Sequence, residues 1–165
     1  MNNEIALDSF TSLTKLEKYV LLHSQWKVLY DNKSDSVCNL SNGIALLKQI
    51  FDWWWVGVYR VNGEQLMLGV FQGPPACTNI LKGKGVCGLA WEQGNTLVVD
   101  DVREFPGHIA CSWESISEIV IPIRLQSGEI WGVLDADSRF LSHFDATDKI
   151  ELEEFCRNLG VFLSQ

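Results

Sequence analysis

Residues 118–138 read EIVIPIRLQSGEIWGVLDADS, and this stretch decides the fold. Two runs, 118–125 and 130–138, are rich in residues that favour strands, and they flank a Ser-Gly turn at 127–128. This pattern is typical of an antiparallel hairpin. In the second run Asp135 and Asp137 alternate with apolar residues, and alternate residues of a strand share one face. The hairpin therefore predicts a sheet with both aspartates on the same side.

The flanking sequence adds a second hairpin and several helices. Runs at 53–61 and 64–72 enclose an Asn-Gly turn, and 96–101 is expected to form a further strand. Helical spacing of apolar residues predicts helices over 11–31, 37–51, 86–93 and from about 145 onward. In the first of these helices, Leu13, Leu16, Val20 and Leu21 lie at helical spacing. The sum is an α+β fold, an antiparallel sheet covered by helices, in a single domain over residues 1–165.

Composition narrows the choice of partners. The 165 residues carry a net charge of −8 and contain no basic run, so nucleic acid and anionic membranes are poor candidates. No apolar stretch is long enough to cross a bilayer, and no secretory signal is visible, so we expect a cytoplasmic protein. In such a reducing compartment the five cysteines should be free thiols, metal ligands or catalytic groups.

Three of the cysteines lie in predicted loops rich in glycine, proline and polar residues. Cys77, Cys87 and Cys111 have this setting, whereas Cys38 and Cys156 fall in helical segments and are expected to be buried apolar residues. Thiols in loops are more often reactive than those in regular elements, because loops carry functional groups on a rigid scaffold. The pattern raises the hypothesis of thiol redox chemistry.

Other motifs are weaker. Residues 83–88 match G-x-G-x-x-G, but no strand precedes them directly and no long crossover helix follows, which favours a glycine-rich turn over a dinucleotide site. Backbone amides near Val86 could still hold an oxygen atom. His108 and Cys111 are three residues apart, but no second ligand pair exists, so we expect no metal. A Cys–His hydrolase lacks a nucleophile elbow and a third orienting group.

Acidic and aromatic residues form a second group. A carboxylate cluster of Glu118, Asp135 and Asp137 could hold a cation while one member stays protonated, although strand-end aspartates often only cap turns. Trp55 and Tyr59 are core candidates, and they could also form an aromatic wall beside an ammonium or thioether group.

The segments WVGVYR, FQGPPAC, GKGVCG, DVREFPGHIAC, SEIVIPI and GVLDADS together resemble the free methionine-(R)-sulfoxide reductases, which are stand-alone GAF-domain proteins. The similarity runs from about Asn39 to Asp148. It implies a GAF-like antiparallel sheet of about five to six strands flanked by helices. It also implies an oxidoreductase that converts free L-methionine (R)-S-oxide to L-methionine.

The resemblance assigns roles by position. Cys111 matches the attacking cysteine, Cys77 the resolving cysteine, and Cys87 a third that assists or substitutes. Glu118, Asp135 and Asp137 match the residues that hold the substrate, and Trp55 and Tyr59 match the aromatic lining. The family implies no bound cofactor, recycling by thioredoxin or a related dithiol, and either a Cys77–Cys111 or a Cys87–Cys111 bridge. A homodimer is an open alternative.

The chain also departs from the family pattern. Ser112 follows Cys111 where an aspartate is usual, and loss of that carboxylate should favour the thiolate slightly. Bulky Trp113 comes next, and Trp54 stands where asparagine is frequent. Two rival functions remain: a GAF sensor that binds a small molecule, and a thiol redox switch without turnover.

Overall fold

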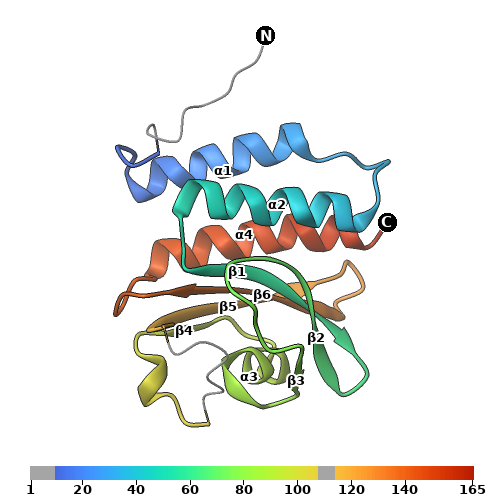
Figure 1. Ribbon diagram of the computed structural model, residues 1–165. Helices are drawn as coiled ribbons and strands as arrows, with labels where there is room; N and C mark the ends of the chain where they lie inside the picture. The colour runs from blue at the N-terminus through green and yellow to red at the C-terminus, as the bar shows by residue number, and fades with distance from the viewer. Residues whose placement is uncertain (1–9, 108–113) are drawn as a thin grey trace.

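A six-stranded antiparallel sheet divides the molecule into two unequal layers (Figure 1). In this computed structural model, which describes residues 10–107 and 114–165, the strand order is β3-β2-β1-β6-β5-β4. The strands are β1 (Trp55–Asn62), β2 (Gln65–Gln72), β3 (Asn79–Leu81), β4 (Leu97–Val99), β5 (Ser117–Arg124) and β6 (Ile130–Ser138). Neighbouring strands all pair antiparallel, so the predicted sheet is confirmed.

Three long helices lie on one side of the sheet and a short one on the other (Figure 1). The long helices are α1 (Lys15–Leu29), α2 (Ser36–Phe51) and α4 (Ala146–Leu163), with α1 as the outermost. The short helix α3 (Gly85–Gln93) and a 3-10 turn at Val102–Glu104 lie on the opposite side. The α+β prediction is therefore confirmed. None of the helices in the described ranges is long and apolar enough to cross a membrane.

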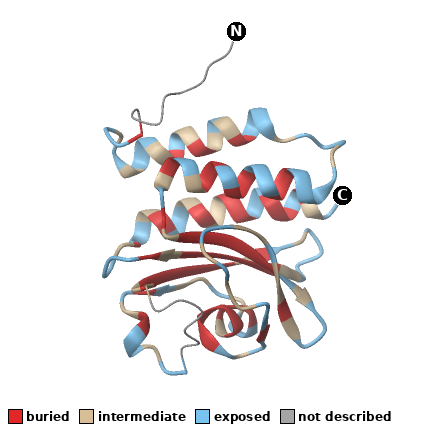
Figure 2. Ribbon diagram, viewed as in Figure 1, coloured by how far each residue is buried: buried red, intermediate tan, exposed pale blue. Residues whose placement is uncertain are grey.

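The hairpin at 118–138 forms the centre of the sheet, as its sequence predicts. β5 and β6 pair with Glu118 opposite Asp137 and Ile121 opposite Leu134. Because side chains alternate along each strand, Ile119, Ile121 and Leu134 all face the long helices, where they join the larger apolar core. Figure 2 shows this buried layer between the sheet and α2 and α4.

The opposite face of the same strands packs under α3. Trp55 and Tyr59 of β1 lie there with Val120 and Val133, and they form a smaller core with residues of α3. Two acidic side chains, Glu118 and Asp135, are buried on this face. The sheet thus has one uniformly apolar face and one face that mixes apolar and ionisable groups.

Helix ends follow local capping rules, but the first helix buries a different face from the sequence expectation. Leu16 and Val20 are 57% and 64% exposed, whereas Tyr19, Leu22 and Trp26 are buried. Because α1 is the outer helix, only a narrow strip of it can touch α2 and α4. Its Tyr19 hydroxyl donates to Asp148 Oδ1 at 2.7 Å, which ties α1 to the start of α4.

Candidate functional site

A small pocket lies between α3 and the face of the sheet that packs under it, and its cavity is about 50 Å³. This volume is far below the roughly 300–1,000 Å³ of sites for drug-sized ligands, so the pocket suits a small molecule. The lining residues are Trp55, Tyr59, Pro74, Pro75, Ala76, Ile80, Lys84, Gly85, Val86, Cys87, Ser115, Glu118, Asp135 and Asp137.

Three carboxyl groups line one wall. Glu118 comes from β5, and Asp135 and Asp137 come from β6, with Glu118 directly opposite Asp137 in the ladder. Glu118 and Asp135 are buried and Asp137 is half-buried. The predicted meeting of these three residues is therefore observed, and it follows from strand alternation plus the antiparallel register.

Burial makes these carboxyl groups unusually weak acids. Desolvation, and then the neighbouring carboxylates, raise the pKa of Glu118 well above its usual range. The pKa of Asp135 is raised in the same way by desolvation and by Asp137. Desolvation also raises the pKa of Asp137 to about 7, although a hydrogen bond from the Ser115 side chain opposes the shift. At neutral pH the wall therefore holds protons as well as negative charge.

Cys87 reaches the same wall from the first turn of α3. Its Sγ donates to Glu118 Oε1 at 3.9 Å, and one ligand atom each from Cys87, Glu118 and Asp135 lie within 4.8 Å of one another. Burial, reinforced by Asp135 and Glu118, raises the pKa of the Cys87 thiol well above its usual range. A neutral thiol is a poor nucleophile, so this arrangement does not activate Cys87 for attack.

The glycine motif at 83–88 spans the end of the turn after β3 and the first turn of α3. The expectation that no strand directly precedes it was wrong, but α3 has only nine residues, so no long crossover helix follows. Gly85 has a φ of +60°. A Cβ on Gly88 would lie 2.4 Å from the carbonyl oxygen of Leu81, so only glycine fits there. β3 itself was missed in the sequence, because a three-residue strand in a turn-rich segment leaves no periodic pattern.

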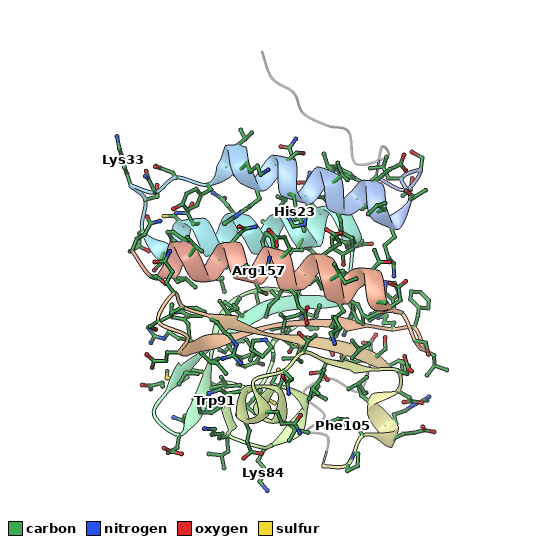
Figure 3. The ribbon with its side chains drawn as sticks, turned by 180° about the vertical axis from the view of Figure 1, so that it is seen from behind. His23, Lys33, Lys84, Trp91, Phe105 and Arg157 are labelled. Carbon is green, nitrogen blue, oxygen red and sulfur yellow. The ribbon has the colours of Figure 1, made fainter. Side chains whose placement is uncertain are left out.

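This turn aims the N-terminus of α3 at the pocket. Gly85, Val86 and Cys87 supply the first helical N–H groups and line the pocket, and the N-cap residue Lys84 makes no side-chain cap. N–H groups at a helix start lack intrahelical acceptors and attract anions. Lys84 itself points away from the sheet (Figure 3), so its ammonium is not directed at the carboxylates.

An aromatic wall completes the pocket. The Trp55 ring stacks on Phe71 at 5.5 Å and on Tyr59 at 5.9 Å between centroids. Trp55 Nε1 donates to the carbonyl oxygen of Pro74 at 3.1 Å, which fixes the segment leading to Cys77. The structure thus places both predicted aromatic residues at the site.

The predicted environment is confirmed for one of the other cysteines and wrong for another. Cys77 is half-buried and disulfide-bonded, whereas Cys38, Cys87 and Cys156 are free thiols. Cys156 is buried as predicted, but Cys38 is exposed. The prediction for Cys38 was wrong because α2 turns that position away from the sheet. Cys111, with His108, Ser112 and Trp113, lies outside the described residues.

One lining residue, Ser115, and one contact outside the lining, made by Arg139, were not identified from the sequence. Ser115 hydrogen-bonds to Asp137 from the segment just before β5, a link that requires the strand register to be known. Beside it, the guanidinium of Arg139 lies 3.4 Å from the Trp54 ring centroid and its Nη2 lies 2.5 Å from Glu114 Oε2. The chain position of Arg139, directly after β6, gave no signal of this contact.

Comparisons with known proteins agree on the family. The family model of the GAF domain matches residues 39–163. The chain is 49% identical to GAF domain-containing protein A of Dictyostelium discoideum over 88% of this chain and 92% of that protein. It is 39% identical to the free methionine-R-sulfoxide reductase of Saccharomyces cerevisiae over 89% of this chain and 86% of that protein.

A solved structure agrees as well. Free methionine-R-sulfoxide reductase from Neisseria meningitidis, in complex with its substrate, superimposes with a TM-score of 0.86 at 46% identity. The match covers 92% of this chain and 91% of that one. The curled six-stranded sheet with four helices is thus a GAF fold, as the resemblance implied.

Proposed function

This chain belongs to the GAF-domain family of the free methionine-(R)-sulfoxide reductases, and on that premise we propose that it reduces free L-methionine (R)-S-oxide to L-methionine. The observation that carries the proposal is the pairing of the carboxyl wall with the start of α3 across one small pocket. A free amino acid has an ammonium and a carboxylate, and these two walls complement both charges. A methionine inside a peptide has neither group.

The weak acidity of the wall supports a role in the chemistry. A sulfoxide oxygen becomes a better leaving group when a proton donor reaches it in the transition state. Glu118 and Asp135 have raised pKa values, so one of them can keep a proton at neutral pH and donate it. Asp137, with a pKa of about 7, can stay ionised and pair with the ammonium.

The proposed reaction uses two thiols. The Cys111 thiolate attacks the sulfoxide sulfur, the oxygen passes to Cys111 as a sulfenic acid, and methionine leaves. The Cys77 thiol then attacks the sulfenic sulfur, which forms a disulfide and releases water. The disulfide at Cys77 is what this step would leave behind. Thioredoxin or a related dithiol would then return both thiols to the reduced state.

Cys87 fits a supporting role better than a nucleophilic one in this proposal. Its thiol is neutral at physiological pH and contacts Glu118. A neutral thiol can donate a weak hydrogen bond to the carboxyl wall, and it becomes a nucleophile only if the wall rearranges.

The test is a coupled assay of thioredoxin-dependent NADPH oxidation with free methionine sulfoxide, each sulfur epimer supplied separately. Steady turnover on the R epimer and none on the S epimer is expected, and N-acetylmethionine sulfoxide should be a poor substrate. Tight binding of the R epimer without turnover would overturn the proposal and favour a sensor. Oxidation of the thiols by peroxide, with no methionine released, would favour a redox switch.

Variants assign the two thiols. Cys111→Ser should abolish turnover, and Cys77→Ser should release about one methionine per reduced enzyme and then stall. Cys38→Ser is the matched control, because this thiol is exposed on the helical side and should be dispensable. Normal cycling of Cys77→Ser with thioredoxin would contradict the resolving role.

A further inference from the structure

We propose that Cys87, Glu118 and Asp135, here called the acid–thiol cluster, form a binding site for a thiophilic divalent cation such as Zn²⁺ or Cd²⁺, and that a cation held there blocks the pocket. The three residues come from α3, β5 and β6, which are separate elements packed together. The binding claim stands independently of the proposed function. Only the blocking claim shares the pocket with it.

The spacing of the ligand atoms suits a small cation. One ligand atom from each residue lies within 4.8 Å of the others, and Cys87 Sγ is 3.9 Å from Glu118 Oε1. Zinc bonds of roughly 2.3 Å to sulfur and 2.0–2.2 Å to oxygen place two such ligands about 3.5 Å apart at a tetrahedral angle. A small rotation of the Glu118 side chain would bring its oxygen from 3.9 Å to this distance from Cys87 Sγ.

An orphaned oxygen points to a missing partner. Asp135 is only 7% exposed, and its Oδ1 has no hydrogen-bond partner among the described residues. A buried carboxylate oxygen without a partner is costly, and such groups are normally paired or coordinate a cation. Cys87 and Glu118 already contact each other and the Asp135 side chain, so a bound cation would supply the partner that Asp135 Oδ1 lacks.

No protein cation fills this place in the described ranges 10–107 and 114–165. The groups that shift the pKa values of Cys87, Glu118 and Asp135 are all acids or thiols, with no lysine or arginine among them. The nearest basic lining residue, Lys84, points away from the sheet (Figure 3). The cluster therefore offers a thiol and two weakly acidic carboxyl groups, which would release protons when a cation binds.

The donor set selects the kind of metal. One thiolate and two carboxylates give three protein ligands, and the fourth position faces the pocket, where water can enter. Mixed sulfur and oxygen ligands in low number suit Zn²⁺ or Cd²⁺, whereas Mg²⁺ requires near-octahedral oxygen ligands. Binding transfers the Cys87 proton to solvent as the sulfur–metal bond forms.

The sequence predicts that Glu118 and Asp135 could help to hold a cation, but it does not bring Cys87 to them, because Cys87 is 31 residues from Glu118. A cation in the acid–thiol cluster would lie in the same pocket wall as Asp137, to which we assign the ammonium of the amino acid. The cation should therefore compete with free methionine.

The experiment is a Cd²⁺ titration of the full-length reduced chain in which Cys38, Cys77 and Cys111 are replaced by serine. Cys87 and Cys156 then remain as the only thiols. A saturable ultraviolet thiolate-to-cadmium band at one equivalent is expected. Adding Cys87→Ser should remove the band, and adding Cys156→Ser should leave it, since that buried thiol is in the helical core.

Two carboxyl variants test the rest of the cluster. Glu118→Gln and Asp135→Asn should each weaken Cd²⁺ binding by about tenfold or more, because even loss of a second-shell partner costs 10–100-fold in metal affinity. Thermal unfolding of each variant shows that it is folded, and Cd²⁺ should raise the melting temperature only where binding persists. A band that survives Cys87→Ser, or equally tight binding of Mg²⁺, would overturn the proposal.

A competition arm tests the blocking claim. Free methionine should lower the apparent Cd²⁺ affinity, whereas alanine at the same concentration, which chelates the metal in solution through the same groups, should not. Cadmium binding without competition from methionine would refute blocking. If methionine itself does not bind in calorimetry, the proposed function fails while the cation site stands.

Discussion

The two faces of the central hairpin are made by the same strands, but one is apolar and packs into the core, whereas the other carries buried carboxyl groups. On the helix side, Ile121 and Leu134 pack into the larger core with exposures of 2% and 0%. On the α3 side, Glu118 and Asp135 are buried, and no lysine or arginine of residues 10–107 and 114–165 is among the groups that shift their pKa values. The apolar face stabilises the fold. The carboxyl groups of the second face are desolvated at a cost in stability, and a bound ligand that pairs with them would offset this cost.

The largest expected effect comes from removing an apolar side chain from the helix-facing side of the hairpin. Leu134→Ala should lower the free energy of unfolding by about 3–4 kcal/mol, since it leaves a cavity in a close-packed core. Activity per folded molecule should stay near normal, because the side chain points away from the pocket. Urea unfolding and turnover of the same sample measure both quantities. A large loss of turnover with normal stability would contradict the division of the two faces.

A substitution on the face that lines the pocket should instead lower turnover without lowering stability. Glu118→Gln should reduce turnover by about 100-fold, comparable to removing one donor from an oxyanion hole. Stability should be unchanged or higher, because a buried ionisable group is replaced by a neutral one of the same shape. Steady-state kinetics and unfolding measure the two effects. Glu114→Gln is the matched control, because this carboxylate pairs with Arg139 and does not line the pocket. Unchanged kinetics would remove Glu118 from the mechanism.

The stability of the protein should depend on pH through the carboxyl groups of the pocket. The pKa of Asp137 is raised to about 7 in the folded state from its ordinary value of 3.8, so between these values the native protein holds a proton that the unfolded chain has released. This contribution to stability is fully present below about pH 4 and is lost as pH rises through 7. Asp137→Asn should therefore gain about 2 kcal/mol relative to wild type at pH 8 and little at pH 4.

Thermal melts of both proteins across that range give the measurement. Asp101→Asn is a suitable control, since Arg103 holds the pKa of that half-buried carboxyl below its usual range. A wild-type stability that does not fall between pH 4 and 8 would count against a buried, weakly acidic wall.

The rim of the sheet should give the smallest effect. Arg139→Ala removes a stacked guanidinium over Trp54 and an ion pair with Glu114, both partly exposed. We expect a loss of about 0.5–1 kcal/mol in unfolding free energy. Arg139→Lys keeps the charge but not the planar stack, so it should recover only part of this loss. Full recovery by lysine would show that stacking on Trp54 contributes nothing.

The same contrast explains what could be predicted from the sequence. The two strand-favouring runs around the turn at 127–128 made both strands of the hairpin predictable, and the two-residue spacing of Asp135 and Asp137 made their shared face predictable. Helix α1 was placed correctly, but Leu16 and Val20 turned out exposed, since an outer helix of low amphipathicity gives no sign of which side is covered. The approach of Cys87 to Glu118 depends on how the glycine turn aims α3, and no spacing rule encodes that.

The central claim is that the pocket recognises an unblocked amino acid through the carboxyl wall. The most direct test is calorimetry on the Cys111→Ser variant, which should bind without turning over, with free L-methionine (R)-S-oxide compared with its N-acetyl derivative. We predict that the N-acetyl compound, which lacks the ammonium, binds about 100-fold more weakly, because a buried carboxylate is left unpaired. Equal affinity for the two compounds would contradict the account.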